Sequence, residues 1–253
     1  MDKKHLINEL KAEGFSDLII NAFEKVNREK FVPESLKQYA YHNKPLPIAL
    51  GATISQPYTI AFMLNLLELD KLINSDLINT DYDVKKLSKH EKSRYLEKNK
   101  HYKSQKLDIN KNFTNKKVEN IIKILEIGSG SGYVLALMNE ILKNQKIKNY
   151  SIYGIERIYE LVVSSRKVLK NKNIEIIEGD GSKGLTNKAS FDRILVSAAF
   201  EKIPKNLFVQ LKENGILVTP VINSIFRFKK IRGKIETEDF PGFVFVPVVK
   251  DLD

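Results

Sequence analysis

Apolar residues recur at helical spacing in two stretches within the first 70 residues. In the first stretch, residues 6–26, Gly14 interrupts the pattern and Ser16 follows as a candidate helix N-cap. The second stretch covers residues 58–69 and comes directly after Pro57, a residue that suits the first turn of a helix. The spacing therefore predicts two short amphipathic helices at the start of the chain and a third after Pro57.

Prolines interrupt the pattern between the second and third predicted helices. They occur in three segments, Phe31-Val-Pro33, Lys44-Pro-Leu-Pro-Ile48 and Gly51-Ala-Thr-Ile-Ser-Gln-Pro57. Because proline has no backbone N–H and a fixed φ, these segments are not expected to form regular helix. We expect an ordered loop in this part of the chain.

From residue 121 onward, near-continuous apolar runs alternate with helical patterns. The predicted strands cover residues 121–127, 151–156, 174–178, 193–197 and 215–220. This alternation predicts an α/β fold with a doubly wound, mostly parallel sheet that is covered on both faces. No helical pattern separates the last two apolar runs, residues 225–231 and 243–249, so we expect them to pair as an antiparallel hairpin joined by a charged turn.

Residues 70–120 do not follow either pattern. They contain 13 Lys and Arg against 8 Asp and Glu, with few aliphatic residues. The composition favours an insertion that is a solvated helical or disordered excursion. Its aromatic residues leave open a nucleic-acid arm, because rings can stack on bases; they are Tyr82, Tyr95, Tyr102 and Phe113. We therefore expect an N-terminal helical and loop extension (1–69), an insertion (70–120) and a core (121–253) that forms one compact domain with the extension.

Bulk composition narrows the function classes. The 253-residue chain is 42% hydrophobic, enough for a sizeable core, and no apolar run approaches the roughly 20 residues that span a bilayer. We expect a cytoplasmic protein without a membrane partner. The chain has no cysteine, which excludes disulfides, thiolate metal sites and a cysteine nucleophile. The net charge of +11 would suit a nucleic-acid partner, but about half of the excess lies in residues 70–120.

The most informative motif is a glycine-rich turn after the first predicted strand of the core. Gly128, Gly130 and Gly132 alternate directly after an apolar run, which allows the backbone to turn sharply and to approach a ligand. A dinucleotide fingerprint would have Gly or Ala at position 133, where this chain has Tyr133. NAD and FAD are therefore disfavoured and S-adenosylmethionine is favoured, the alternative being a turn that binds no ligand.

Acidic residues end the next two predicted strands, at the sheet edge where α/β folds bind ligands. Glu156 could accept two hydrogen bonds from a ribose diol, unless it is a surface residue paired with Arg157. Asp180 could accept from an adenine amino group, unless it belongs to an ordinary Asp-Gly turn. The fourth strand ends in Ser197-Ala-Ala-Phe200 and lacks the Asn/Asp-Pro-Pro-aromatic motif common in base-amine methylases. A base methyltransferase is therefore disfavoured.

The positions of the histidines indicate which kind of group accepts the methyl group. His42 is the only histidine near the proline-rich loop, and a histidine-based triad has no support. A carboxylate acceptor needs no strong base, because it is already ionised at neutral pH. Methyl transfer to a carboxylate would then depend on holding the acceptor in line and excluding water.

Several motifs together resemble the protein-L-isoaspartate (D-aspartate) O-methyltransferase family, whose core is the Rossmann-like fold of class I S-adenosylmethionine-dependent methyltransferases. The Thr53-Ile-Ser-Gln-Pro57 segment is the most specific of them. The matching segments are Arg28-Glu-Lys-Phe-Val-Pro33, Ala40-Tyr41, Pro45-Leu-Pro-Ile48, Gly51-Ala-Thr-Ile-Ser-Gln-Pro57, Leu125-Glu-Ile-Gly-Ser-Gly-Ser-Gly-Tyr133, Gly154-Ile-Glu-Arg157, Gly179-Asp-Gly181, and Ile203-Pro204 with Gln210-Leu211.

The resemblance implies a reaction and a set of site residues. The enzyme would methylate L-isoaspartyl residues of damaged proteins with S-adenosylmethionine, leaving S-adenosylhomocysteine, and D-aspartyl residues would be an additional substrate. Ser55 would be the catalytic residue that touches the substrate carboxylate, with Ala198 and Ala199 beside it. The implied cofactor contacts are Thr53, Ile54, Ser55, Glu126, Gly128, Ser129, Gly130, Glu156, Arg157, Asp180, Gly181 and Ser197. No metal and a monomeric state are expected.

Three alternatives stay open at this point. From the residues alone, the Ser55 hydroxyl could simply cap the helix that begins at Pro57. The basic charge leaves room for a nucleic-acid methyltransferase. Departures from the family pattern at Leu50, at His42-Asn-Lys44 and after Pro220 leave room for a homologue that only binds.

Overall fold

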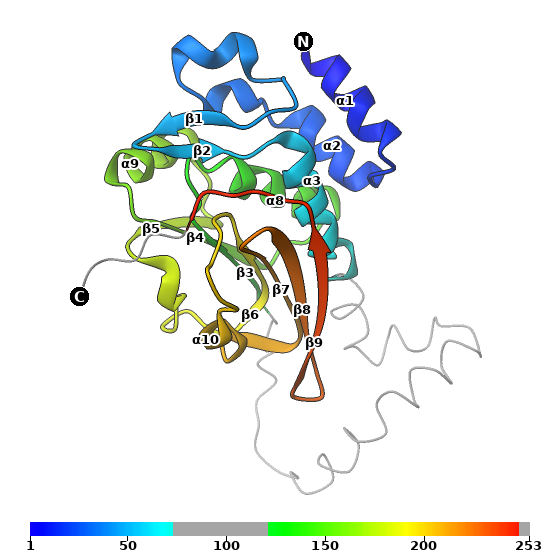
Figure 1. Cartoon of the computed structure of the whole chain (residues 1–253), viewed down its shortest axis with the longest axis vertical. Helices are drawn as coiled ribbons and strands as arrows, with labels where there is room; N and C mark the ends of the chain where they lie inside the picture. The colour runs from blue at the N-terminus through cyan, green and yellow to red at the C-terminus, as the bar shows by residue number, and fades with distance from the viewer. Residues whose placement is uncertain (73–120, 248–253) are drawn as a thin grey trace, which may run out of the picture. The chain divides into compact units, whose positions relative to one another are not determined.

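A computed structural model describes residues 1–72 and 121–247 of the chain (Figure 1). Contacts within the chain define two units, Met1–Asp70 with Ile121–Asp253, and Lys71–Asn120. The predicted lysine-rich insertion, apart from its first three residues, lies outside the described residues. The arrangement below is that of the first unit.

The core of this unit is a seven-stranded sheet with the order β5-β4-β3-β6-β7-β8-β9. Its first five strands in this order are parallel, and β8 and β9 are antiparallel to their neighbours. The chain therefore winds outward from β3 in both directions, which confirms the predicted doubly wound fold. The strands are β3 (Ile122–Ile127), β4 (Tyr150–Glu156), β5 (Ile174–Glu178), β6 (Phe191–Val196), β7 (Leu211–Val221), β8 (Ser224–Ile231) and β9 (Lys234–Pro241).

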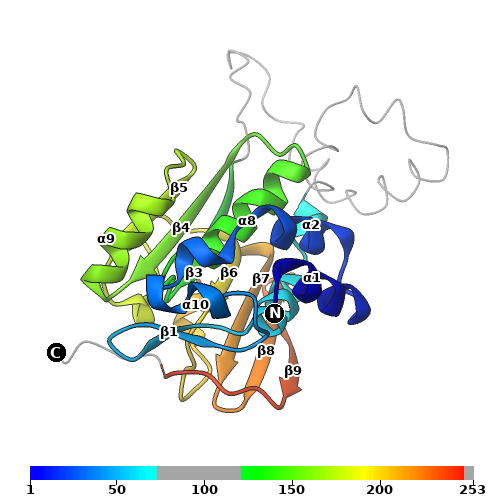
Figure 2. The same ribbon diagram turned by 90° about the horizontal axis from the view of Figure 1, so that it is seen from above.

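Helices cover the two faces of the sheet unequally. Figure 1 shows α8 (Tyr133–Asn144) and α9 (Tyr159–Val168) above the sheet and the short α10 (Lys205–Phe208) below it. Figure 2 looks onto the face that α8 and α9 cover. The lower face packs an aromatic and aliphatic cluster that includes Phe191, Leu207 and Phe228, each almost fully buried. Loop side chains and the single turn of α10 therefore cover this face, and the expected cover on both faces of the sheet is confirmed.

The N-terminal extension packs against the upper layer. Its helices are α1 (Lys3–Ala12), α2 (Asp17–Lys25) and α3 (Pro57–Leu66), with the short 3-10 helices η1 (Arg28–Phe31), η2 (Glu34–Tyr39) and η3 (Leu69–Leu72), and a fourth, η4 (Gly181–Lys183), lies in the core. Phe23 of α2 meets the Tyr133 ring at the start of α8, with ring centroids 6.1 Å apart. The three helices confirm the prediction, including Pro57 at the first position of α3. Ser16 occupies the N-cap position of α2 but makes no side-chain cap hydrogen bond.

Two predictions of local structure are wrong, and the first concerns the proline-rich segment that was expected to be a loop. The proline-rich segment contains a two-stranded antiparallel hairpin, β1 (Leu46–Ala49) and β2 (Ala52–Ile54). Its prolines are compatible with strands this short, because an isolated hairpin leaves many N–H groups outside the ladder.

The second error concerns the C-terminal hairpin. The partner of β8 is β9, the charged segment that was expected to be a turn. As an edge strand, β9 exposes most of its side chains, so its sequence looks like a solvated loop. Residues 243–247 instead form a strap, fastened by hydrogen bonds from Phe243 N to Asn223 O (3.1 Å) and from Ala199 N to Val246 O (2.8 Å). Residues 248 and 249 lie outside the described residues.

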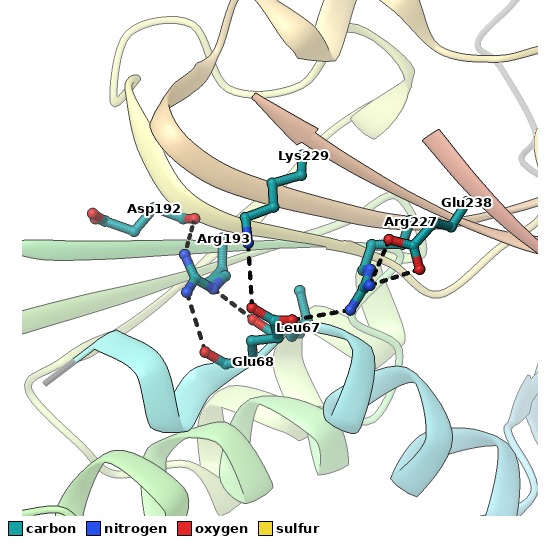
Figure 3. A network of polar contacts seen from close by, with 7 residues as sticks. All are labelled: Leu67, Glu68, Asp192, Arg193, Arg227, Lys229 and Glu238. Carbon is teal, nitrogen blue, oxygen red and sulfur yellow. Dashed lines mark hydrogen bonds and ion pairs between the residues drawn. The ribbon is translucent and has the colours of Figure 1, made fainter. Parts of the chain in front are cut away.

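A buried arginine joins the extension to the sheet (Figure 3). Arg193 of β6 donates from Nε to Leu67 O at 2.5 Å and from Nη2 to Glu68 O at 3.1 Å, directly after the end of α3. The first bond satisfies the carbonyl of the C-cap residue, which has no intrahelical partner, and the second binds the residue after it. The Glu68 carboxylate pairs with Arg227 of β8 at 3.0 Å, and Arg227 also pairs with Glu238 of β9 at 2.6 Å. The end of α3 is thus fixed against β6 and β8, and Arg227 extends the network to β9.

Candidate active site

The glycine motif forms the predicted strand–turn–helix. Gly128, Gly130 and Gly132 have φ angles of +74°, +52° and +83°, a region that other residues rarely adopt. Gly132 immediately precedes α8, and a Cβ at this residue would lie 2.5 Å from the Leu169 side chain. Gly128 N donates to Ile155 O of β4 at 2.9 Å, which ties the turn to the neighbouring strand. The backbone of this turn is therefore tightly constrained, and three of its five residues carry no side chain.

Glu156 closes one side of the turn. It ends β4 and is only 6% exposed. Its Oε2 accepts a hydrogen bond from Gly130 N at 2.8 Å, and its Oε1 accepts one from Ile158 N at 2.9 Å. Burial excludes the alternative of a surface glutamate. The carboxylate is held in one orientation at the turn, whereas the side chain of Arg157 is exposed.

A second buried acid lies at the end of β3. Glu126 is 1% exposed, and its Oε1 accepts a hydrogen bond from Ser197 Oγ at 2.7 Å. Burial, with a smaller contribution from the charge of Glu156, raises the pKa of Glu126 to about 8, against the opposing effect of the Ser197 hydrogen bond. In the described part of the chain, Glu126 Oε2 and Ser129 Oγ are buried without a hydrogen-bond partner. Two unsatisfied polar atoms at a glycine-rich turn are the feature expected of a site that a polar ligand completes.

Asp180 lies at the end of β5, as predicted. Its carboxylate accepts hydrogen bonds from Ser182 N and Ser182 Oγ, both at 2.8 Å, and so caps η4. The alternative of a local turn role is therefore realised in this structure. A Cβ on Gly181 would lie 2.5 Å from Ile127 Cγ2, which places the end of β5 directly against the end of β3. Asp180 and the glycine turn thus border the same end of the sheet.

Ser55 and Ser197 line one pocket of about 250 Å³. Ser55 follows the β1–β2 hairpin, and Ser197 follows β6, so the pocket joins the extension to the core. Ile48 of the hairpin also reaches the glycine turn, since its Cδ1 would lie 3.3 Å from a Cβ on Gly130. The pocket is lined by Pro45, Thr53, Ser55, Gln56, Thr59, Ser197, Val244, Phe245 and Val246.

The Ser55 hydroxyl does not cap α3. The N-cap position belongs to Gln56, without a side-chain cap bond, and the side-chain oxygen of Asn43 accepts from Tyr58 N at 3.0 Å. Among the hydrogen bonds of residues 1–72 and 121–247, none involves Ser55 Oγ. The capping alternative is therefore wrong, and this hydroxyl is available to a ligand in the pocket.

The remaining predicted residues surround the same region. Ala198 borders the glycine turn, because its Cβ would lie 3.7 Å from a Cβ on Gly128. Ala199 holds the strap through Val246. Ile54 is buried at 5% exposure, and Thr53 faces the pocket. The predicted substrate and methionine-side residues thus lie on adjoining elements.

Sequence reasoning missed three contributors to the site. Asn43 takes over the cap of α3, the strap supplies Val244 to Val246, and Arg28 donates from Nη2 to Ser55 O at 2.9 Å. Arg28 belongs to the Arg-Glu-Lys-Phe-Val-Pro segment, so its motif was visible although its burial was not. The described residues contain no group of three His, Asp or Glu that could hold a metal ion, and no helix in them is long and apolar enough to cross a membrane.

Comparison with known proteins gives a single family for almost the whole chain. A family model for protein-L-isoaspartate(D-aspartate) O-methyltransferase (PCMT) matches residues 1–76 and 69–253. Similar proteins include the protein-L-isoaspartate O-methyltransferase of Petrotoga mobilis, 36% identical over 95% of this chain and 92% of its own length. The enzyme of the same name from Fervidobacterium nodosum is 35% identical over 96% of this chain and 99% of its own.

Solved structures agree on the fold. A beta-aspartate methyltransferase (PCMT) from Plasmodium falciparum, crystallised in complex with S-adenosyl-L-homocysteine, covers 99% of this chain and all of its own, with a TM-score of 0.69 at 23% identity. A second protein-L-isoaspartate O-methyltransferase covers 99% of this chain and 67% of its own, with a TM-score of 0.71 at 21% identity. At these identities the likeness concerns the fold.

Proposed function

Since the chain belongs to the protein-L-isoaspartate(D-aspartate) O-methyltransferase family, we propose that it transfers a methyl group from S-adenosylmethionine to the α-carboxylate of L-isoaspartyl residues in damaged proteins. The observation that carries this proposal is the pocket shared by Ser55 and Ser197, in which the Ser55 hydroxyl has no bond within the described residues. D-aspartyl residues are a second substrate of the same chemistry.

The glycine turn and its acidic neighbours fit the cofactor. Glu156, oriented by Gly130 N and Ile158 N, would accept from the ribose hydroxyls, and the unsatisfied oxygen of Glu126 would accept a hydrogen bond from the ammonium group. Asp180 and Gly181 would border the adenine, Gly128, Ser129 and Ser197 the methionine part, and Thr53, Ile54 and Ser55 would cover it from the hairpin. Arg157 is the weakest of the predicted contacts because its side chain is exposed.

Bound S-adenosylmethionine supplies an electrophilic methyl group on its sulfonium sulfur. The acceptor carboxylate is ionised at neutral pH, so the site needs no general base. The Ser55 hydroxyl would donate one hydrogen bond to this carboxylate and so orient its second oxygen toward the methyl group. Exclusion of water from this pocket, which Thr59 and Val246 also line, would favour the transfer, because water would otherwise solvate the anion.

The product of this transfer is a methyl ester, which is a better electrophile than the free acid. The backbone nitrogen that follows the isoaspartyl residue would attack the ester carbonyl, and methanol would leave as the five-membered succinimide closes. Hydrolysis of that ring then yields normal aspartate in part. The repair therefore requires the protein only for the methylation step.

The direct test measures methyl transfer from labelled S-adenosylmethionine to an isoaspartyl peptide, to the matched aspartyl peptide and to RNA. We expect label in the isoaspartyl peptide only. Ser55→Ala should lower kcat about tenfold to a hundredfold, the range for losing a hydrogen bond to a charged group. Ser16→Ala is the matched control, since this exposed serine makes no cap bond. Label in RNA alone would mean a nucleic-acid methyltransferase, and cofactor binding without any transfer would mean a binding homologue.

A cytoplasmic location and a monomeric state belong to the same proposal. Size-exclusion chromatography with light scattering checks the second of these. A dimer would contradict it without affecting the proposed reaction.

A further inference from the structure

Arg28 is a fully buried cation without an acidic partner in the described chain. Its exposed fraction is 0%, and burial lowers the pKa of its guanidinium to about 10, so it stays charged at neutral pH. Its Nε and Nη1 atoms are buried and make no hydrogen bond within residues 1–72 and 121–247. Burying a charge without a paired counter-charge is costly. Such a residue is expected where its contacts serve a purpose beyond packing.

Two contacts define what Arg28 joins. Its Nη2 donates to the backbone carbonyl of Ser55 at 2.9 Å. Its guanidinium carbon lies 5.1 Å from the centroid of the Tyr133 ring, within the range of a cation–π interaction. Tyr133 is the first residue of α8 and directly follows the glycine turn. The side chain therefore spans from the hairpin loop to the start of the helix that the turn introduces.

Tyr133 occupies the position at which a dinucleotide fingerprint has a small residue. Here its ring is buried at 2% exposure and packs against Phe23 and Phe31, with centroid distances of 6.1 and 5.3 Å. The ring is thus held in place by aromatic neighbours and offers a fixed surface to the guanidinium. The same tyrosine that disfavours a dinucleotide provides the support for Arg28.

We propose that Arg28 is a positioning residue for the methyl transfer, which fixes the Ser55 backbone against the first residue of α8. This proposal rests on the proposed function. One donor bond on the carbonyl of Ser55 restricts the rotation of the peptide that carries the hydroxyl, and the Tyr133 ring provides a rigid reference beside the glycine turn. The distance from hydroxyl to cofactor then depends on Arg28, although Arg28 need not touch substrate or cofactor. Small errors in such positioning lower kcat strongly.

A purely structural role makes a different prediction, and the chain offers a matched control. Arg193 is also buried, also has a pKa lowered by burial to about 10, and also donates to backbone carbonyls, at Leu67 and Glu68. Its bonds lie at the far end of α3. Arg28→Gln and Arg193→Gln remove comparable buried charges, so a general loss of stability appears in both variants.

The experiment combines these variants with Ser55→Ala in a double-mutant cycle, measured on an isoaspartyl peptide. We expect Arg28→Gln to lower kcat about tenfold or more while the affinity for S-adenosylhomocysteine and the peptide KM change less than about threefold. In the Ser55→Ala background the same substitution should lower kcat less than about threefold, because it acts through the absent hydroxyl. Arg193→Gln should lower Tm with kcat within about twofold of wild type. An equal fold-decrease in kcat for Arg28→Gln in the wild-type and Ser55→Ala backgrounds would overturn the proposal.

A second measurement does not depend on turnover. Hydrogen exchange of the amides of residues 53–56 should be at least about tenfold faster in Arg28→Gln than in Arg193→Gln. Unchanged exchange there would refute the positioning role even if the peptide is not the substrate. Tyr133→Phe, which keeps the ring, should behave as wild type in exchange, and Tyr133→Leu should resemble Arg28→Gln. Absence of methyl transfer by the wild-type protein would instead refute the proposed function.

Discussion

The side-chain oxygen of Asn43 accepts a hydrogen bond from the backbone N–H of Tyr58 at 3.0 Å. Asn43 lies before the β1–β2 hairpin and Tyr58 lies after it, in the first turn of α3. The bond therefore closes the base of the hairpin and satisfies a helix N–H that has no intrahelical partner. The same bond caps α3 in place of the Ser55 side chain, so the Ser55 hydroxyl stays available in the pocket.

Asn43→Ala should lower stability and activity together. Losing a helix cap costs about 1 kcal/mol, and the hairpin that carries Ser55 becomes less constrained at its base. Thermal unfolding and the methyl-transfer rate provide the two readouts. Ser55→Ala is the comparison, because it should lower the rate while leaving Tm close to wild type. A similar fall in Tm for Ser55→Ala would mean that its hydroxyl has a structural role after all.

Glu126 should make stability depend on pH. Its folded pKa is raised from 4.5 to about 8, so the folded protein binds more protons than the unfolded chain between these values. The contribution of Glu126 to the free energy of unfolding is therefore largest below pH 4.5, and it decreases as the pH rises toward 8. Denaturant unfolding at a series of pH values, in wild type and Glu126→Gln, measures this contribution. The variant should show a flatter dependence across this window, and identical slopes would disprove the raised pKa.

Glu156→Gln should weaken cofactor binding. The carboxylate accepts from Gly130 N and Ile158 N and would accept from the ribose as well, so replacing one oxygen by a donor NH₂ affects both sets of bonds. We expect the affinity for S-adenosylhomocysteine, measured by calorimetry, to fall about tenfold to a hundredfold. The exposed Glu160 in the first turn of α9 provides the control, since Glu160→Gln should leave the affinity unchanged.

Gly132→Ala should be much more destabilising than Gly233→Ala. Both residues have positive φ, +83° and +72°, so both substitutions introduce backbone strain of about 1 kcal/mol. Only the Cβ at Gly132 meets another side chain, 2.5 Å from Leu169 Cδ1, whereas nothing lies within 4 Å at Gly233. Overpacking adds about 1–3 kcal/mol at the first site. Chemical denaturation measures the free energy of unfolding of the two variants. Equal losses of this free energy would show that the Leu169 side chain can move aside.

The parts of the structure that the sequence predicted well are those with local causes. The apolar runs identified the five parallel strands, because strands buried on both faces are apolar at nearly every position. The alternating glycines identified the turn, since each of them has a positive φ. Glu156 could also be placed at the turn, because this residue ends the strand next to the turn.

The parts that the sequence did not predict depend on distant contacts. The cap from Asn43 joins residues 15 positions apart, and neither residue type signals it. Arg28 was not expected in the core, because arginine is rarely fully buried and its supports, Tyr133 and the Ser55 carbonyl, lie far away along the chain. β9 has the composition of a loop because only one of its edges is paired.

The charged composition of β9 has a consequence for how the molecule meets its neighbours. An edge strand has a row of unpaired backbone N–H and C=O groups, which can template pairing with another chain. Lys234, Glu236, Glu238 and Asp239 place charges of both signs along this edge, and Pro241 ends it. A second polypeptide that paired with this edge would have to bury those charges. The charged residues that give β9 the composition of a loop therefore also protect the sheet against aggregation.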